Sequence, residues 1–153
     1  MYQTLKNNKM KPRIVVPTVA PEAYEALMNL EKYNAKTSVT TTHKELIKIR
    51  ASQINGCAFC INMHTADARK YGETEKRIYL LSSWREADVY TEEEKAILAL
   101  TEQITMISNH VSDEVYQNAA NLFDEKYLAE IIIIIITINS WNRLAIATGW
   151  RAV

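Results

Sequence analysis

Residues 45–67, ELIKIRASQINGCAFCINMHTAD, contain both cysteines of the 153-residue chain, as a C-x-x-C pair at Cys57 and Cys60. They also contain one of the three histidines, His64, four residues after the second cysteine. Gly56, one of three glycines, directly precedes the first cysteine. Because glycine adopts left-handed backbone easily, one helix is expected to end there and a second to start near Cys57. This stretch therefore predicts an antiparallel helical hairpin with the thiols at its turn.

The rest of the chain has the composition of an all-α domain. Three glycines are spread along the chain, and the three prolines all lie within residues 12–21. Apolar residues recur at helical spacing, and residues that favour helix N-termini punctuate them, including capping-box patterns at Thr42-His-Lys-Glu45 and Thr91-Glu-Glu-Glu94. We expect about six to seven helices, at residues 21–34, 42–55, 57–71, 74–84, 91–107, 112–122 and 125–148.

The last predicted helix contains six consecutive isoleucines at residues 131–136. Propensity alone favours a strand there, because β-branched side chains are stiff in helices. We predict a helix because the flanking residues favour helix and no second segment reads as a strand to pair with it. A helix that is apolar on every side is expected to be buried on every side. It should therefore be the central helix or be covered by another subunit.

Two segments are predicted, an extended N-terminal arm at residues 1–20 and a helical domain at residues 21–153. Pro12 and Pro17 favour extended backbone in the arm, and the apolar residues 14–16 between them are expected to pack on the body or on a partner subunit. The arm is basic but lacks the apolar run of a signal peptide.

Charge and hydropathy exclude two classes of partner. The 18 basic and 18 acidic residues give no net charge, which argues against a nucleic-acid binder. The most apolar run, residues 128–138, is interrupted by Glu130 and is too short to span a bilayer. We therefore expect a cytoplasmic protein with no membrane partner. In that reducing compartment a C-x-x-C pair is typical of a catalytic or metal-binding site.

The predicted hairpin gives the cysteines a chemistry. The unpaired N–H groups at a helix start favour anions and lower the pKa of a thiol there. Cys60 and His64 form an i,i+4 pair, so the imidazole can exchange a proton with that thiol. In the hairpin, Glu45 falls opposite residues 64–67, where it can orient His64; Asp67 is a weaker candidate for that role.

These residues predict a dithiol peroxidase cycle. The Cys60 thiolate would attack the O–O bond of a hydroperoxide and become a sulfenic acid. Cys57, expected nearer the helix end and solvent, would condense with it to a disulfide and then be attacked by an external dithiol.

Other interpretations fit parts of the pattern. The cysteines could be buried small hydrophobic residues, or could bind zinc with His64 and either His43 or Glu45. From spacing alone, Glu45 is better explained by the capping box with Thr42. His43 and His110 have no cysteine partner and are expected on the surface. Three aromatic residues are expected in the core: Tyr79, Trp84 and Trp141.

The spacing Glu45-x11-Cys57-x2-Cys60-x3-His64 resembles the core of the carboxymuconolactone decarboxylase / alkylhydroperoxidase D (AhpD-like) family. Flanking segments resemble the family too, at residues 50–57, 77–86, 94–102 and 138–143. The resemblance implies an all-helical fold and a homo-oligomer, as a trimer or hexamer. It implies a cofactor-free peroxidase of alkyl hydroperoxides with a peroxidatic second cysteine, matching Cys60, and a relay matching Glu45 and His64. It also implies a lipoamide-type dithiol as reductant.

The chain departs from this family pattern at one position. Peroxidases with the fullest relay carry a second histidine directly before the second cysteine, where this chain has Phe59. A shorter relay implies weak hydroperoxide activity or a different substrate. Members that decarboxylate the lactone generally lack the cysteine pair, which argues against that reaction. A non-catalytic oligomeric module that senses redox state or holds zinc stays open, as does a lactone decarboxylase-like enzyme.

Overall fold

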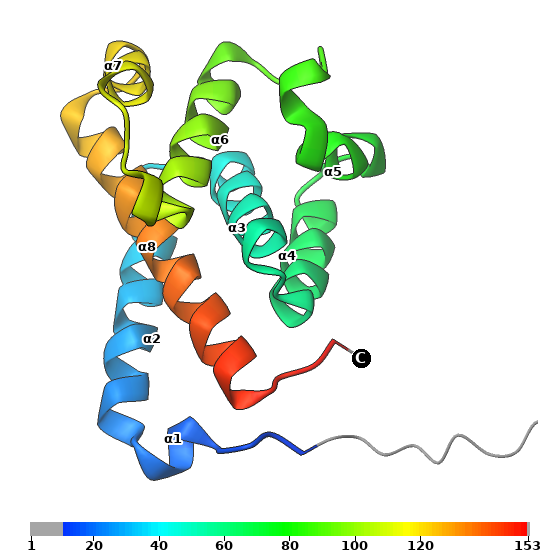
Figure 1. The fold of residues 1–153 in the computed structure, drawn as a ribbon, viewed down its shortest axis with the longest axis vertical. Helices are drawn as coiled ribbons and strands as arrows, with labels where there is room; N and C mark the ends of the chain where they lie inside the picture. Colours follow the sequence, from blue (N-terminus) through cyan, green and yellow to red (C-terminus); the bar gives the residue numbers. More distant parts are fainter. Residues whose placement is uncertain (1–10, 153) are drawn as a thin grey trace, which may run out of the picture.

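The computed structural model describes residues 11–152, and in that range every regular element is a helix (Figure 1). The predicted all-α class is confirmed. The first half of the predicted arm, residues 1–10, lies outside the described residues. In chain order the elements are α1 Val16–Val19, α2 Pro21–Lys36, α3 Thr41–Asn55, α4 Ala58–Lys70, α5 Glu75–Leu80, the 3₁₀ helix η1 Leu81–Glu86, α6 Glu92–Thr105, the 3₁₀ helix η2 Ile107–Asn109, α7 Asp113–Leu122 and α8 Glu125–Thr148.

Helices α3 and α4 form the predicted antiparallel hairpin and lie side by side in Figure 1. Gly56 ends α3 with φ of 70°, the left-handed conformation that glycine adopts without a Cβ penalty. Cys57 is the N-cap of α4, and its sulfur accepts the Cys60 N–H at 3.4 Å. The fold-back at Asn55-Gly56 is therefore confirmed, and it sets both thiols at a helix start.

The capping box predicted at Thr42 and Glu45 is wrong. Thr40 is the N-cap of α3: its backbone is extended and its Oγ1 accepts the His43 N–H at 3.2 Å. Glu45 consequently lies in the second turn of α3, where its carboxylate is free to face a neighbouring helix. The capping box at Thr91 and the cap at Ser112 are present as predicted.

The helix predicted from Thr74 through Trp84 is broken. It becomes α5 followed by η1, with non-helical backbone at Ser83. Two side chains of η1 explain the break, because both reach the buried Glu102 on α6. The Trp84 indole N–H donates to it at 2.9 Å, and Arg85 pairs with it at 2.5 Å.

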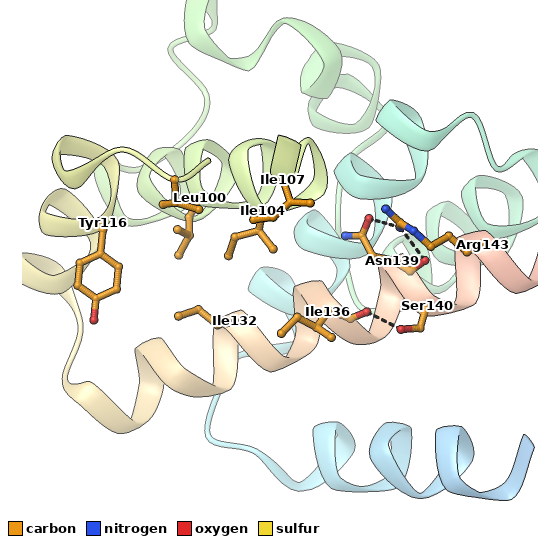
Figure 2. A pocket seen from close by; sticks show the side chains of 10 residues that line it. Leu100, Ile104, Ile107, Tyr116, Ile132, Ile136, Asn139, Ser140 and Arg143 are labelled. Carbon is orange, nitrogen blue, oxygen red and sulfur yellow. Dashed lines mark hydrogen bonds between the residues drawn. The ribbon is translucent and has the colours of Figure 1, made fainter. Parts of the chain in front are cut away.

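Helix α8 is the central helix of the fold and packs against α2, α3, α4, α6 and α7. Its isoleucine run is helical, as predicted, and Ile131, Ile134 and Ile135 are fully buried. Cover of this helix by another subunit stays a prediction; within this chain, Ile136 is 44% exposed. It faces a groove of about 510 Å³ that α6, η2 and α7 complete (Figure 2). The groove is lined by Leu100, Ile104, Ile107, Val111, Tyr116, Ile132, Ile136, Asn139, Ser140 and Arg143.

Among the described helices, only α8 is long and apolar enough to cross a membrane by composition alone. Half of its most apolar window is buried inside the protein, which is also typical of a core helix. The run of residues 128–138, predicted to be too short for a span, is the middle part of this 24-residue helix.

The described part of the arm is tied to the end of α8. The Arg13 backbone N–H donates to the Thr148 carbonyl at 2.8 Å, and its guanidinium donates to the Ala147 carbonyl at 3.2 Å. Ile14 and Val15 are exposed in this chain and do not pack on its body, and packing on a partner subunit stays a prediction. Residues 16–19 form the short helix α1 instead of extended backbone. The arm is thus anchored by its backbone and by one arginine.

Candidate functional site

The two cysteines lie at the start of α4 and are joined in a disulfide, with Cα atoms 5.4 Å apart. Both are only 2% exposed. The expectation that Cys57 lies near solvent is therefore wrong, and the C-terminal segment provides the reason. After α8 the chain turns back, with the Trp150 N–H donating to the Ala145 carbonyl at 2.9 Å. Trp150 stacks edge-on against Phe59, with ring centroids 5.2 Å apart, and these aromatics pack beside the disulfide.

A histidine–carboxylate pair lies one turn further along the hairpin. His64 is on α4, four residues after Cys60, and Glu45 faces it from α3, as the hairpin predicted. The Nδ1–H of His64 donates to Oε2 of Glu45 at 3.0 Å, and the residues are 7% and 8% exposed. Because a carboxylate only accepts, this bond keeps the proton on Nδ1 and leaves Nε2 free to exchange one.

Asp67, the weaker candidate for orienting His64, does not do so. Its carboxylate pairs instead with Lys70 on the outer part of α4, at 2.9 Å. Glu45 is therefore the carboxylate that the fold brings to the imidazole. The structure thus brings together the four site residues predicted from sequence, Glu45, Cys57, Cys60 and His64.

Lys48 is a site residue that sequence reasoning missed. Its ammonium is 2.8 Å from Oε1 of Glu31 on α2 and 3.9 Å from Oε1 of Glu45. The lysine side chain is largely buried. Its spacing three residues after Glu45 placed it on the same helix face and was the available signal. Nothing in the sequence indicated that Glu31 would reach it from another helix.

A cavity of about 370 Å³ opens beside Cys60 and His64. Its wall is mostly aromatic and apolar, with a few charged groups, which is typical of a site for a small organic molecule. Trp141, expected in the core, lines it and packs edge-on against Tyr24 at 5.5 Å. The lining residues are Tyr24, Met28, Glu31, Lys48, Phe59, Cys60, Met63, His64, Asp67, Trp141 and Trp150. The larger groove of Figure 2 is lined by no cysteine, histidine or carboxylate and is separate from this chemistry.

The remaining histidines are not part of the site. His43, expected on the surface, is buried, and its Nδ1 is 2.8 Å from the Tyr127 hydroxyl. Burial lowers the pKa of His43, against the opposing charges of Glu94 and Glu93. His110 is exposed, as expected. Within residues 11–152, no group of three or more His, Cys, Asp or Glu side chains is arranged to hold a metal ion.

Fold and site together define an all-helical protein that carries a paired C-x-x-C next to a buried histidine–glutamate pair. Residues 21–103 match the carboxymuconolactone decarboxylase family, and the chain belongs to that family. It is 52% identical to the uncharacterized protein YdfG of Bacillus subtilis (strain 168) over 144 residues, covering 94% of this chain and 98% of YdfG.

Solved structures share the fold along nearly the whole chain. ATU0492 from Agrobacterium tumefaciens, a protein of unknown function proposed to be the antioxidant defence protein AhpD, is 38% identical with a TM-score of 0.89. That likeness covers 94% of this chain and 99% of ATU0492. An uncharacterized peroxidase-related protein from Silicibacter sp. TM1040 is 16% identical, with a TM-score of 0.78 over 95% of this chain and 94% of its own. At that identity the second likeness shows the fold alone.

Proposed function

We propose that this protein is an AhpD-like peroxidase that reduces organic hydroperoxides by a dithiol–disulfide cycle. The observation that carries the proposal is the Cys57–Cys60 pair at a helix start, one turn from the His64–Glu45 hydrogen bond. A helix start favours a thiolate, and a histidine held by a carboxylate is suited to moving its proton. The proposed role of the 38% identical ATU0492 in antioxidant defence agrees with this class of reaction.

The first half of the cycle oxidises Cys60. His64 takes the proton of the Cys60 thiol, and the thiolate attacks the terminal oxygen of the hydroperoxide. The O–O bond breaks, the sulfur becomes a sulfenic acid, and the alkoxide receives the proton from His64 and leaves as an alcohol. Glu45 stabilises the imidazolium while it holds that proton.

The second half restores the thiols. The Cys57 thiol gives up its proton and its sulfur attacks the Cys60 sulfur, so that the disulfide forms and the departing hydroxide takes that proton and leaves as water. An external dithiol of the lipoamide type then reduces the disulfide to two thiols and becomes a disulfide itself. Both cysteines are 2% exposed in the oxidised protein and the Phe59–Trp150 pair packs beside them, so we expect a local rearrangement of this pair to accompany attack by the reductant.

The test is turnover of an organic hydroperoxide. Purified protein is given cumene hydroperoxide with dithiothreitol or dihydrolipoamide, and peroxide loss is followed. We expect loss above a Cys60→Ser control, and a Cys57→Ser variant that stalls as a sulfenic acid trapped by dimedone. Peroxide loss no faster than the Cys60→Ser control refutes the proposal. Carboxymuconolactone, tested in parallel, is expected to be unchanged.

The trimer or hexamer implied by the family resemblance stays a prediction. Light scattering on the full chain checks it.

A further inference from the structure

Lys48 lies level with the reactive cysteine in the α3–α4 hairpin. Glu45 on α3 is opposite His64 on α4, and their side chains meet at 3.0 Å. In antiparallel helices, a step of one turn toward the connection on one helix corresponds to a step of one turn toward it on the other. Lys48, one turn after Glu45, is therefore opposite the turn that contains Cys60. Both residues also line the same 370 Å³ cavity, which agrees with that register.

The ammonium of Lys48 is held between two carboxylates. Glu31 on α2 binds it at 2.8 Å, and Oε1 of Glu45 is 3.9 Å away. The other oxygen of Glu45 accepts from His64, so the two oxygens of one carboxylate face a lysine and a histidine. Glu31 thereby fixes where the positive charge of Lys48 lies, at the wall of the cavity that Cys60 also lines.

We propose that Lys48 is a positioning residue of the thiol site: its ammonium stabilises the Cys60 thiolate and holds the oxygen of Glu45 that does not face His64. The proposal rests on the thiol chemistry proposed above. It also predicts that Glu31 disfavours the Cys60 thiolate, because a carboxylate bound to Lys48 offsets part of the positive charge that the thiolate experiences.

The charges around the cavity give the sign of the effect. Its charged and titratable lining groups are Tyr24 and Glu31 from α2, Lys48 from α3, and Cys60, His64 and Asp67 from α4, with Glu45 from α3 behind His64. The α8 and C-terminal residues there, Trp141 and Trp150, are uncharged. Asp67 is paired outward with Lys70.

When Cys60 has passed its proton to His64, the charges of His64 and Glu45 cancel, and those of Lys48 and Glu31 cancel. Among the groups that line the cavity, the thiolate then carries the uncompensated charge, and Lys44, which interacts with Glu31, Glu45 and Lys48 from outside the lining, is the same in every variant. Without Lys48, the thiolate lies beside an unpaired Glu31 carboxylate, and the repulsion between them disfavours ionisation. Without Glu31, the ammonium is unpaired and favours ionisation more strongly. The two deletions therefore act in opposite directions.

The experiment measures the iodoacetamide alkylation rate of Cys60 against pH, by mass spectrometry, in a reduced Cys57→Ser background. For Lys48→Met, the pH of half-maximal rate is expected to rise by up to about one unit, since Lys48 and Cys60 line the same cavity and a nearby opposite charge favours ionisation. For Glu31→Gln it is expected to fall. Lys48→Arg keeps the charge and is expected to stay near the parent.

The double variant Lys48→Met/Glu31→Gln is the matched control. It removes both members of the ion pair and leaves their summed charge at zero, so its midpoint is expected to return near the parent. A merely loosened fold would move both single variants the same way. Shifts of equal sign, or an unchanged midpoint in Lys48→Met, overturn the proposal. Alkylation involves no peroxide, so absence of peroxidase turnover would refute the proposed function while leaving this test decisive for Lys48.

Discussion

The variant Glu45→Gln tests the charge of the Glu45 carboxylate while the size of the side chain is kept. Glutamine keeps the size of the side chain and can still bond to neutral His64, but it has no charge to stabilise the imidazolium. The lost interaction is one buried, charge-assisted hydrogen bond of 3.0 Å, worth about 1.5–3 kcal/mol. At about 1.4 kcal/mol per factor of ten, kcat/KM for the hydroperoxide is expected to fall about ten- to a hundredfold. The glutamine amide can also donate to Nδ1 of His64. That bond would favour the tautomer with its proton on Nε2, which could then no longer accept a proton from the thiol.

The assay is steady-state loss of cumene hydroperoxide with saturating dithiothreitol, for wild type and variant. Glu22→Gln, an exposed substitution in the first turn of α2, is the matched control and should leave the rate unchanged. The free energy of unfolding of Glu45→Gln should stay within about 1 kcal/mol of wild type, because the neutral pair still forms a hydrogen bond. A rate within twofold of wild type, in a protein whose Cys60→Ser variant is inactive, would show that Glu45 does not act on the proton transfer.

Three further predictions concern stability. Thr40→Ala should lower the free energy of unfolding by about 1 kcal/mol through loss of the α3 cap, whereas Thr42→Ala should change it little; urea unfolding compares the two. Burial lowers the pKa of His43 in the folded protein, so the unfolded chain binds the proton more readily and stability should fall as pH drops below about 6.5. In His43→Asn that fall should shrink, as shown by thermal melts at pH 5 and pH 7.5. Although burial alone would raise the pKa of Glu102, bonds from Trp84, Arg85 and Arg50 lower it. The ionised Glu102 carboxylate therefore stabilises the folded protein at neutral pH, and this contribution is lost in acid. Glu102→Gln should cost about 3 kcal/mol at pH 7, with the deficit shrinking below about pH 4, measured by chemical unfolding across pH.

Much of the fold was predictable because its signals are local. Gly56 ends α3 through its own backbone freedom, and Thr91 caps α6 through a residue three positions away. The start of α3 was not predictable in this way. Thr40, Thr41 and Thr42 are consecutive, and any of them could accept an N–H from the first turn. The choice of Thr40 goes together with Glu45 facing His64, which is a contact between helices.

The same division between local and distant contacts holds in the site. The hairpin places Glu45 opposite residues 64–67, but spacing alone favours a capping box with Thr42, and the contact with His64 is a finding of the structure. The cavity could not be predicted from local spacing, because its wall includes Tyr24 from α2 and Trp141 from α8. Those residues are distant in sequence and meet only through packing around the central helix. For the same reason the sequence does not indicate the ion pair between Lys48 and Glu31.

Phe59 shows how a residue can have two consequences at once. From sequence it is a missing histidine and predicts a shorter relay. In the folded chain it also packs on Trp150 beside a disulfide that is 2% exposed at each cysteine. A histidine there would be more polar and would pack less well against an indole. Phe59 is therefore expected to help keep the Cys57–Cys60 sulfurs from solvent as well as to shorten the predicted relay. We expect a change at Phe59 to alter reduction of the disulfide as well as attack on the peroxide, so the two half-reactions must be measured separately.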